Sequence, residues 1–178
     1  MNEVIQHPPR TIMEVYKMLP EGTLAELIDN NIYMSPSPHT LHQQVSFKLA
    51  YEIESSLRKN GLGELFSAPL DVYLDEAANA VQPDVFVILK ENASIVQPQG
   101  HIHGVPDLII EILSPGNKNH DLLIKKNLYE KFGVKEYFIA DPESNEVIHY
   151  LLEGGRFVLQ PAQNRLINSQ LLNATFQW

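Results

Sequence analysis

The sequence predicts an α/β fold: a central mixed β-sheet flanked by helices, with hairpins at the N- and C-terminal ends. Residues 85–89 and 108–113 are continuously apolar and rich in β-branched side chains, as expected for strands buried on both faces. Residues 39–60 and a segment from Asn119 or His120 to Phe132 repeat apolar residues at helical spacing. Helices and strands therefore alternate through the centre of the chain.

The N-terminal elements follow from periodicity and turn residues. Residues 10–19 have helical spacing, and residues 24–35 alternate around a turn at Asp29–Asn31, which predicts a hairpin. The 39–60 helix follows a Ser-Pro-Ser-Pro break and ends at Gly61. Its apolar face comprises Leu41, Val45, Leu49, Ile53 and Leu57, widened by Phe47 and Ala50.

The remaining elements are shorter. Residues 64–74 predict one or two strand pieces, 75–79 a polar loop and 90–104 an irregular connection. The apolar face of the second helix comprises Leu122, Ile124, Leu128 and Phe132. Residues 136–140 predict a strand, residues 147–159 a hairpin with a Gly-Gly turn, and residues 170–176 a single apolar piece.

Composition limits the classes of function. The chain has 178 residues, 44% of them hydrophobic and none cysteine, which predicts one domain over 1–178 and excludes disulfides, thiolate metal sites and cysteine nucleophiles. We expect residues 1–9, which are polar and proline-rich, to be flexible. No apolar run is long enough for a membrane span and no export signal opens the chain, so we expect a cytoplasmic protein without a membrane partner.

Charge argues against a simple nucleic-acid-binding protein. The formal net charge is −9, from 13 Lys and Arg against 22 Asp and Glu, whereas phosphate-binding proteins are usually basic. Residues 116–135 are locally basic, with five lysines against Asp121 and Glu130. Such a run is usually a solvated helix face, so it permits nucleic-acid binding without indicating it.

Glu111 is the first candidate for chemistry because it interrupts an apolar strand. A buried carboxylate without a partner costs several kcal/mol, so Glu111 should be protonated, paired or bound to a metal. Strand alternation places it on the same face as Asp107. An exposed position at the end of the sheet, or a pairing with lysine or arginine, is the structural alternative.

Asp84 precedes the other buried strand, directly after Pro83. If the two strands are neighbours, Asp84 and Glu111 can converge on one hard cation such as Mg²⁺ or Mn²⁺, which carboxylate oxygens bind well. Ordinary turn chemistry explains an Asp at this position equally well.

Asp121, Lys125 and Tyr129 are spaced at i, i+4 and i+8, so they share one face of the second helix. Lys125 could neutralise charge developing on a phosphate or hold an attacking water. A surface Asp–Lys pair beside a tyrosine at the core edge is the simpler explanation. Glu26, between Ala25 and Leu27, could hold a second metal or orient a water, although a solvent-facing hairpin position suits it better.

The histidines do not favour zinc. His39 and His42 are three residues apart at a helix start, and His101 and His103 flank Ile102, but a structural zinc site needs about four ligands. His42 suits a first-turn or cap position nearly as well as a substrate contact.

The order of several short motifs resembles the Uma2 family (DUF820) of bacterial restriction-endonuclease-like proteins. The motifs are residues 26–29 (Glu-Leu-Ile-Asp), 34–38 (Met-Ser-Pro-Ser-Pro) with His42, 67–72 (Ser-Ala-Pro-Leu-Asp-Val), 81–84 (Val-Gln-Pro-Asp), 106–115 (Pro-Asp-Leu-Ile-Ile-Glu-Ile-Leu-Ser-Pro), Asp121, Lys125, Tyr129, 133–137 and 141–142. The resemblance covers roughly residues 10 to 160. One small departure is Asn30, where the family has a turn glycine.

The resemblance implies the PD-(D/E)XK restriction-endonuclease-like fold, with Asp84 and Glu111 as metal ligands. The usual pattern places lysine two residues after the acid, where this chain has Leu113, so Lys125 is the candidate for that lysine. We therefore expect a Mg²⁺- or Mn²⁺-dependent hydrolase that cleaves phosphodiester bonds in nucleic acid, with DNA favoured over RNA. Asp84, Glu111, Lys125 and Glu26 would be its catalytic residues, and His42, Asp121 and Tyr129 its substrate contacts.

Two other functions stay open at this point. A catalytically silent binding or assembly module that kept the fold is favoured by the acidic charge and by Leu113, and hydrolysis of a small phosphate ester would use the same residues. Sheet edges at both ends favour self-association as a homodimer.

Overall fold

The computed structural model describes residues 8–114 and 120–178, and its centre is a six-stranded mixed sheet. The strands lie in the order β11 (Arg156–Leu159), β10 (Glu146–Glu153), β9 (Glu136–Ala140), β8 (Leu108–Ile112), β6 (Val85–Leu89) and β3 (Gly63–Ser67). Only the β8–β9 pair is parallel within this order. The predicted α/β class with a central mixed sheet is confirmed.

A smaller sheet carries the N-terminal hairpin. Its order is β2 (Asn31–Met34), β1 (Ala25–Ile28), β5 (Ala80–Val81), β4 (Val72–Tyr73) and β7 (Ile102–His103). Helix α1 (Ile12–Lys17) lies beside it and is shorter than the predicted 10–19. Asp29 and Asn30 both have positive φ angles, 45° and 61°, so Asn30 adopts the turn conformation in place of glycine.

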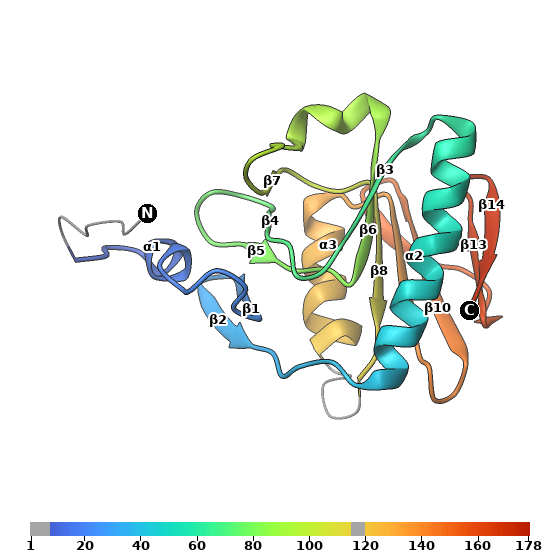
Figure 1. Cartoon of the computed structure of the whole chain (residues 1–178), viewed down its shortest axis with the longest axis horizontal. Coiled ribbons are helices and arrows are strands. Elements are labelled where there is room, and N and C mark those ends of the chain that lie inside the picture. Colours follow the sequence, from blue (N-terminus) through green and yellow to red (C-terminus); the bar gives the residue numbers. More distant parts are fainter. Residues whose placement is uncertain (1–7, 115–119) are drawn as a thin grey trace.

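The main sheet is covered on both faces (Figure 1). Helix α2 (Thr40–Asn60) and the hairpin of β13 (Leu166–Ser169) and β14 (Ala174–Gln177) cover one face, packing against Val85, Val87 and Leu108. Helix α3 (Lys126–Phe132) and the small sheet cover the other, packing against Phe86 and Ile109. Alternate residues of β6 and β8 therefore enter two different cores, as strands buried on both faces require.

Helix α2 has the predicted bounds but a different inner face. Val45, Leu49, Ile53 and Leu57 are buried as expected, whereas Leu41 is 46% exposed and Phe47 is 77% exposed. Phe47 is two residues from Val45 and from Leu49, about 200° around the helix, and so points to the opposite side. His42, one turn before Val45, takes the inner position instead. No helix of the described residues is both long and apolar enough to cross a membrane.

The second predicted helix begins as a π-helical turn, His120–Lys125, and continues as α3. The predicted apolar face is wrong in part, because Ile124 is exposed to 36%. Asp121, Lys125 and Tyr129 are buried together on the sheet-facing side, in agreement with their predicted common face. Asp121 and Lys125 turn inward although they are polar, so an analysis of apolar periodicity does not find them.

Three connections contain more structure than predicted. The 90–104 segment holds a 3₁₀ helix (Lys90–Ile95) and β7, and β12 (Gln163–Asn164) pairs with β10. The predicted single piece over 170–176 is instead the turn and most of the second strand of the β13–β14 hairpin. Predictions for residues 1–7, Lys118 and Asn119 lie outside the described part of the chain.

The 75–79 loop holds the N-terminal hairpin in place. Asp75 Oδ1 accepts hydrogen bonds from the backbone N–H groups of Ala77 (2.8 Å), Ala78 (2.6 Å) and Asn79 (3.1 Å). Asp75 Oδ2 accepts from the Asn79 side chain, whose own oxygen accepts from Asp29 N at 2.9 Å. Burial opposes ionisation of Asp75, but these hydrogen bonds outweigh it and lower the pKa of the carboxyl.

Replacing Asp75 with asparagine is predicted to lower the free energy of unfolding at pH 7 by about 1–3 kcal/mol, because the loop loses its charged acceptor. A carboxyl whose pKa is lower in the folded than in the unfolded protein stabilises the fold at pH values above its unfolded pKa. This stabilisation is lost as pH falls through the folded pKa. The stability difference between wild type and Asp75→Asn should therefore shrink as pH falls from 7 toward 3. Urea unfolding at several pH values measures it. Glu21→Gln, at an exposed position, is the control, and a constant difference across pH would contradict the prediction.

Candidate active site

Two adjacent strands bring Asp84 and Glu111 together. Strands β6 and β8 are antiparallel, with Val85 opposite Ile110, so Asp84 before β6 lies opposite Glu111 near the end of β8. Asp84 N donates to Glu111 Oε2 at 3.3 Å, and Asp84 Oδ2 accepts from Ile112 N at 2.8 Å. The predicted proximity of the two acids is what the structure shows.

Glu111 is 2% exposed, so an exposed position at the sheet end is excluded. Its Oε1 atom accepts from Lys125 Nζ at 2.9 Å and from the Tyr129 hydroxyl at 2.7 Å. Both donors come from the helical segment that follows β8 and lies against that face of the sheet. The Lys125 ammonium and the Tyr129 hydroxyl therefore both bind the Oε1 atom of Glu111, and the Oε2 atom faces Asp84.

Lys125 is shared among three carboxylates. Its Nζ atom lies 3.0 Å from Glu26 Oε1 and 3.6 Å from Asp121 Oδ1, in addition to Glu111. The side chain is 7% exposed, so the interpretation as a surface Asp–Lys pair is wrong. Leu113, at the position where the PD-(D/E)XK pattern has lysine, is buried in the apolar core.

Glu26 is buried in the hairpin and does not face solvent, contrary to the structural alternative considered for it. Its Oε2 atom lies 3.1 Å from His120 Nε2, and its Oε1 atom accepts from Gln82 N at 2.9 Å. Sequence reasoning missed His120 and Gln82 as site residues. Only their positions in the sequence could have indicated them, because His120 directly precedes Asp121 and Gln82 directly precedes the Pro83–Asp84 pair.

His42 connects helix α2 to the acids. Its Nε2 atom lies 3.0 Å from Asp84 Oδ2, and the ring is buried in the first turn of the helix. Among the buried side-chain atoms of the described residues, His42 Nδ1 has no hydrogen-bond partner. Such a nitrogen requires a water or a ligand.

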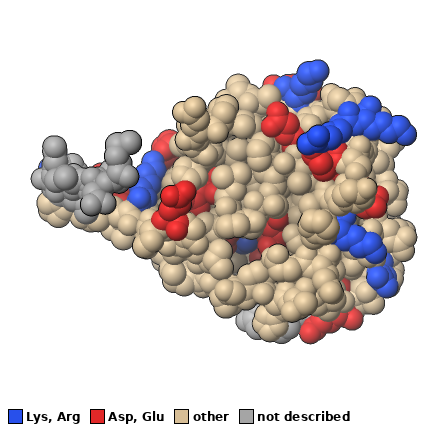
Figure 2. Space-filling model, viewed as in Figure 1, with Lys and Arg blue, Asp and Glu red and all other residues tan. Residues whose placement is uncertain are grey.

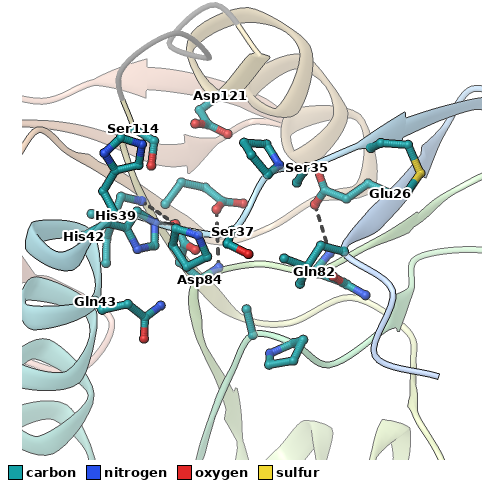
Figure 3. A pocket seen from close by; sticks show the side chains of 18 of the residues that line it. Glu26, Ser35, Ser37, His39, His42, Gln43, Gln82, Asp84, Ser114 and Asp121 are labelled. Carbon is teal, nitrogen blue, oxygen red and sulfur yellow. Dashed lines mark hydrogen bonds and ion pairs between the residues drawn. The ribbon is translucent and has the colours of Figure 1, made fainter. Parts of the chain in front are cut away.

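A pocket of about 420 Å³ lies at this end of the sheet, and among its lining residues are Glu26, His42, Gln82, Asp84, Glu111, Asp121 and Lys125. Figure 3 shows Glu26, Gln82, Asp84 and Asp121 around it, with Ser37, His39, His42 and Gln43 entering from the start of α2. Figure 2 shows Asp, Glu and Lys or Arg atoms recessed near the middle of this face, surrounded by uncharged side chains. The pocket therefore contains charged side chains that are recessed below the surrounding surface.

Burial and mutual repulsion govern ionisation in the pocket. Burial raises the pKa of Glu111 well above its ordinary range; Lys125 opposes this shift, and neighbouring carboxylates reinforce it. Burial likewise raises the pKa of Asp121. Burial would raise the pKa of Glu26 too, but Lys125 and the hydrogen bonds from His120 and Gln82 lower it overall. The paired carboxylates hold the pKa of Lys125 well above its ordinary value despite burial, so it remains a cation.

The donor set fits a divalent hard cation. Four carboxylates (Glu26, Asp84, Glu111 and Asp121) and only one lysine, Lys125, line the pocket, which leaves excess negative charge. Of these four residues, Asp84 and Glu111 are in direct contact, because the backbone N–H of Asp84 donates a hydrogen bond to the side chain of Glu111. Within residues 8–114 and 120–178, no three His, Asp or Glu side chains form a ready-made metal site. Two carboxylates completed by water and substrate oxygens is a common Mg²⁺ arrangement.

The other histidines and lysines of residues 8–114 and 120–178 do not line the pocket. His101 and His103 lie beside Tyr73 on the small sheet, and His103 Nδ1 contacts Glu76. The described lysines of the locally basic segment are ion-paired: Lys126 with Glu130, Lys131 with Asp29 and Lys135 with Asp107. The part of this segment that the structure describes, residues 120–135, therefore presents little free positive charge.

A buried Glu136–His149–Ser169 cluster resembles a hydrolytic triad in composition only. The Ser169 hydroxyl donates to Glu136 Oε2 and not to His149, and all three side chains are at most 2% exposed. Glu136 also accepts from the backbone of Gln170 and Leu171. The cluster fastens the C-terminal hairpin to the main sheet and has no access to a substrate.

Comparisons with known proteins agree with this geometry. A search of curated proteins found no match. Among solved structures, a crystal structure described as a putative nuclease belonging to DUF820 from Anabaena variabilis ATCC 29413 matches with a TM-score of 0.69 and 21% identity, covering 87% of this chain and 83% of that one. This likeness concerns the fold. The model of the Uma2 family, described as "Putative restriction endonuclease", matches residues 13–177. The chain therefore belongs to the Uma2 family.

Proposed function

We propose that this protein is a Mg²⁺- or Mn²⁺-dependent phosphodiesterase that cleaves nucleic acid, with DNA as the first substrate to test. The observation that carries the proposal is the meeting of Asp84 and Glu111 at one sheet end with the Lys125 ammonium 2.9 Å from Glu111. Family membership supports a nuclease of the restriction-endonuclease type. A cytoplasmic location and homodimer formation stay predictions from the sequence.

Asp84 Oδ1 and Glu111 Oε2 are the carboxylate atoms best placed to hold the metal. The other oxygen of each is engaged, Asp84 Oδ2 by His42 and Ile112, and Glu111 Oε1 by Lys125 and Tyr129. Bound Mg²⁺ would supply a Lewis acid for the phosphoryl oxygen and a water of lowered pKa. Tyr129 and His42 fix the orientation of the two acids through these contacts.

Hydrolysis forms a bond from a water oxygen to phosphorus and breaks one phosphorus–oxygen ester bond. The water loses a proton and the departing alkoxide gains one. Lys125 stays protonated, so its role is to stabilise the negative charge of the transition state and not to remove the proton. Asp121 lines the pocket and has a raised pKa, which suits a proton acceptor.

Glu26 acts through Lys125 in this proposal. Both of its oxygens are occupied, by Lys125 and Gln82 on one and His120 on the other, so it is a positioning residue and not a ligand of a second metal. Glu26, which belongs to the N-terminal hairpin, thereby fixes the position of the Lys125 ammonium.

One observation favours a catalytically silent module. The net charge is −9, and on the face drawn in Figure 2 Lys and Arg side chains form no continuous basic surface. Calorimetry separates the two functions, because a silent module should bind neither Mg²⁺ nor Mn²⁺ through Asp84.

Replacing either acid with its amide is predicted to abolish cleavage. Asp84→Asn and Glu111→Gln should each lower the rate of DNA cleavage in Mg²⁺ by at least about 100-fold, because the metal loses a charged ligand. Gel assays with single- and double-stranded DNA and RNA measure the rate, with EDTA as a blank. Glu52→Gln, exposed on α2, is the matched control. Wild-type rates in either amide variant would contradict the proposal.

Lys125→Met tests the lysine separately from the metal. Cleavage should fall by about 10²- to 10³-fold, whereas the fraction of the variant that remains folded should still bind Mn²⁺ in calorimetry, because the methionine removes charge stabilisation and no metal ligand. Lys126→Met, the next residue along, should cleave at the wild-type rate, since its ion pair with Glu130 lies outside the pocket. Cleavage by Lys125→Met within about threefold of wild type would show that this lysine has no catalytic role.

A further inference from the structure

Helix α2 carries two aromatic side chains that face solvent. Phe47 is 77% exposed and Tyr51 is 64% exposed, whereas every other Phe, Tyr and Trp of the described residues is buried or half-buried. The two residues are four apart, so they lie on one face of the helix, about 6 Å apart along its axis. Single exposed apolar side chains are ordinary on a protein surface, but neighbouring exposed aromatic rings indicate a binding surface.

This face of α2 continues from the pocket. Gln43 lines the pocket, and Figure 3 shows it on the helix at that side. Gln43, Phe47 and Tyr51 follow one another at i, i+4 and i+8, with a turn of about 40° around the helix from each to the next. We call these three residues the aromatic stripe. A chain that leaves the pocket on this side therefore meets Phe47 first and Tyr51 next.

The charge around the aromatic stripe suits a polyanion. Residues 30–51 contain no Asp or Glu, although the chain has a net charge of −9. Lys48 is exposed, forms no ion pair with the described residues and lies three residues before Tyr51, on the neighbouring part of the helix surface. Glu54, one turn beyond Tyr51, is ion-paired with Arg58. Exposed aromatic rings beside an unpaired cation are typical of surfaces that bind single-stranded nucleic acid.

We propose that the aromatic stripe stacks against the unpaired bases of a single-stranded nucleic acid whose scissile phosphate lies in the pocket. Stacking on a protein ring requires unpaired bases, because both faces of a base are covered inside a duplex. A duplex would have to be bound mainly through its phosphates, and Lys125, the one described lysine that lines the pocket, is already shared by three carboxylates. This inference rests on the proposed function and narrows its substrate to unpaired strands.

The test measures binding apart from cleavage. Fluorescence anisotropy gives the affinity of the full chain, with Ca²⁺ in place of Mg²⁺, for a fluorescein-labelled oligothymidylate of about 12 nucleotides. Wild type should bind this strand at least about tenfold more tightly than its duplex with oligoadenylate. Phe47→Ala and Tyr51→Ala should each weaken binding of the single strand by about 5- to 100-fold, the loss expected for one stacked base. Phe47→Tyr, which keeps a ring, should stay within about threefold of wild type.

Leu159→Ala is the matched control, since it truncates a side chain that is 63% exposed on β11 and does not line the pocket. It should keep the wild-type affinity. No binding of the single strand, equal affinity for the duplex, or wild-type affinity in either alanine variant would overturn the proposal. So would a wild-type dimer that Phe47→Ala converts to a monomer in sedimentation, because a second copy of the chain would then cover the stripe.

The outcomes also separate this inference from the nuclease activity. Cleavage of nucleic acid in Mg²⁺ without a preference for unpaired strands would leave the proposed function standing and remove only the role of the stripe. Single-strand binding that depends on Phe47 and Tyr51, in a protein that cleaves nothing, would support the stripe and remove the nuclease activity.

Discussion

The buried ammonium of Lys125 is the interaction on which the site depends. Glu26, Glu111 and Asp121 come from a hairpin, a central strand and a π-helical turn, and each lies within 3.6 Å of the same nitrogen. Without that cation, three carboxylates would be buried side by side at a cost of several kcal/mol each. The lysine thus joins these three segments through ion pairs, in addition to their apolar packing.

The network also explains why negative charge remains available. One ammonium does not balance four carboxylates, and Asp84 accepts hydrogen bonds from His42 and a backbone N–H group without contacting the lysine. The antiparallel register of β6 and β8 places this acid against Glu111. The excess of carboxyl groups in the pocket favours a divalent cation.

The elements with strong periodicity are predictable from the sequence, and the inward-facing polar residues are not. Apolar patterns predict the bounds of α2, β6 and β8 to within one residue. The i, i+4, i+8 spacing correctly predicts that Asp121, Lys125 and Tyr129 share one face. The prediction fails where buried polar residues replace the expected apolar ones, as in the second helix. His120 is not predictable because its partner, Glu26, is 94 residues away. Phe47 misleads because an exposed aromatic side chain suggests a core position.

Leu113 shows how one function can be supplied from a different part of the chain. The position two residues after Glu111 faces the apolar core, and the helix supplies the amine instead. The spacing of the sequence motif changes while the contact between lysine and acid remains. The sequence motif alone lacks the lysine at this position, whereas the structure places a lysine from the helix in contact with the same acid.

We expect one divalent ion to bind between Asp84 and Glu111. Anomalous diffraction from a crystal of the wild-type protein soaked in Mn²⁺ would locate this ion. We predict a single strong peak within about 2.5 Å of a carboxylate oxygen of each residue, with Lys125 still in contact with Glu111. No peak at this position, or a peak bound by other residues while Asp84 and Glu111 keep only their hydrogen bonds, would contradict it.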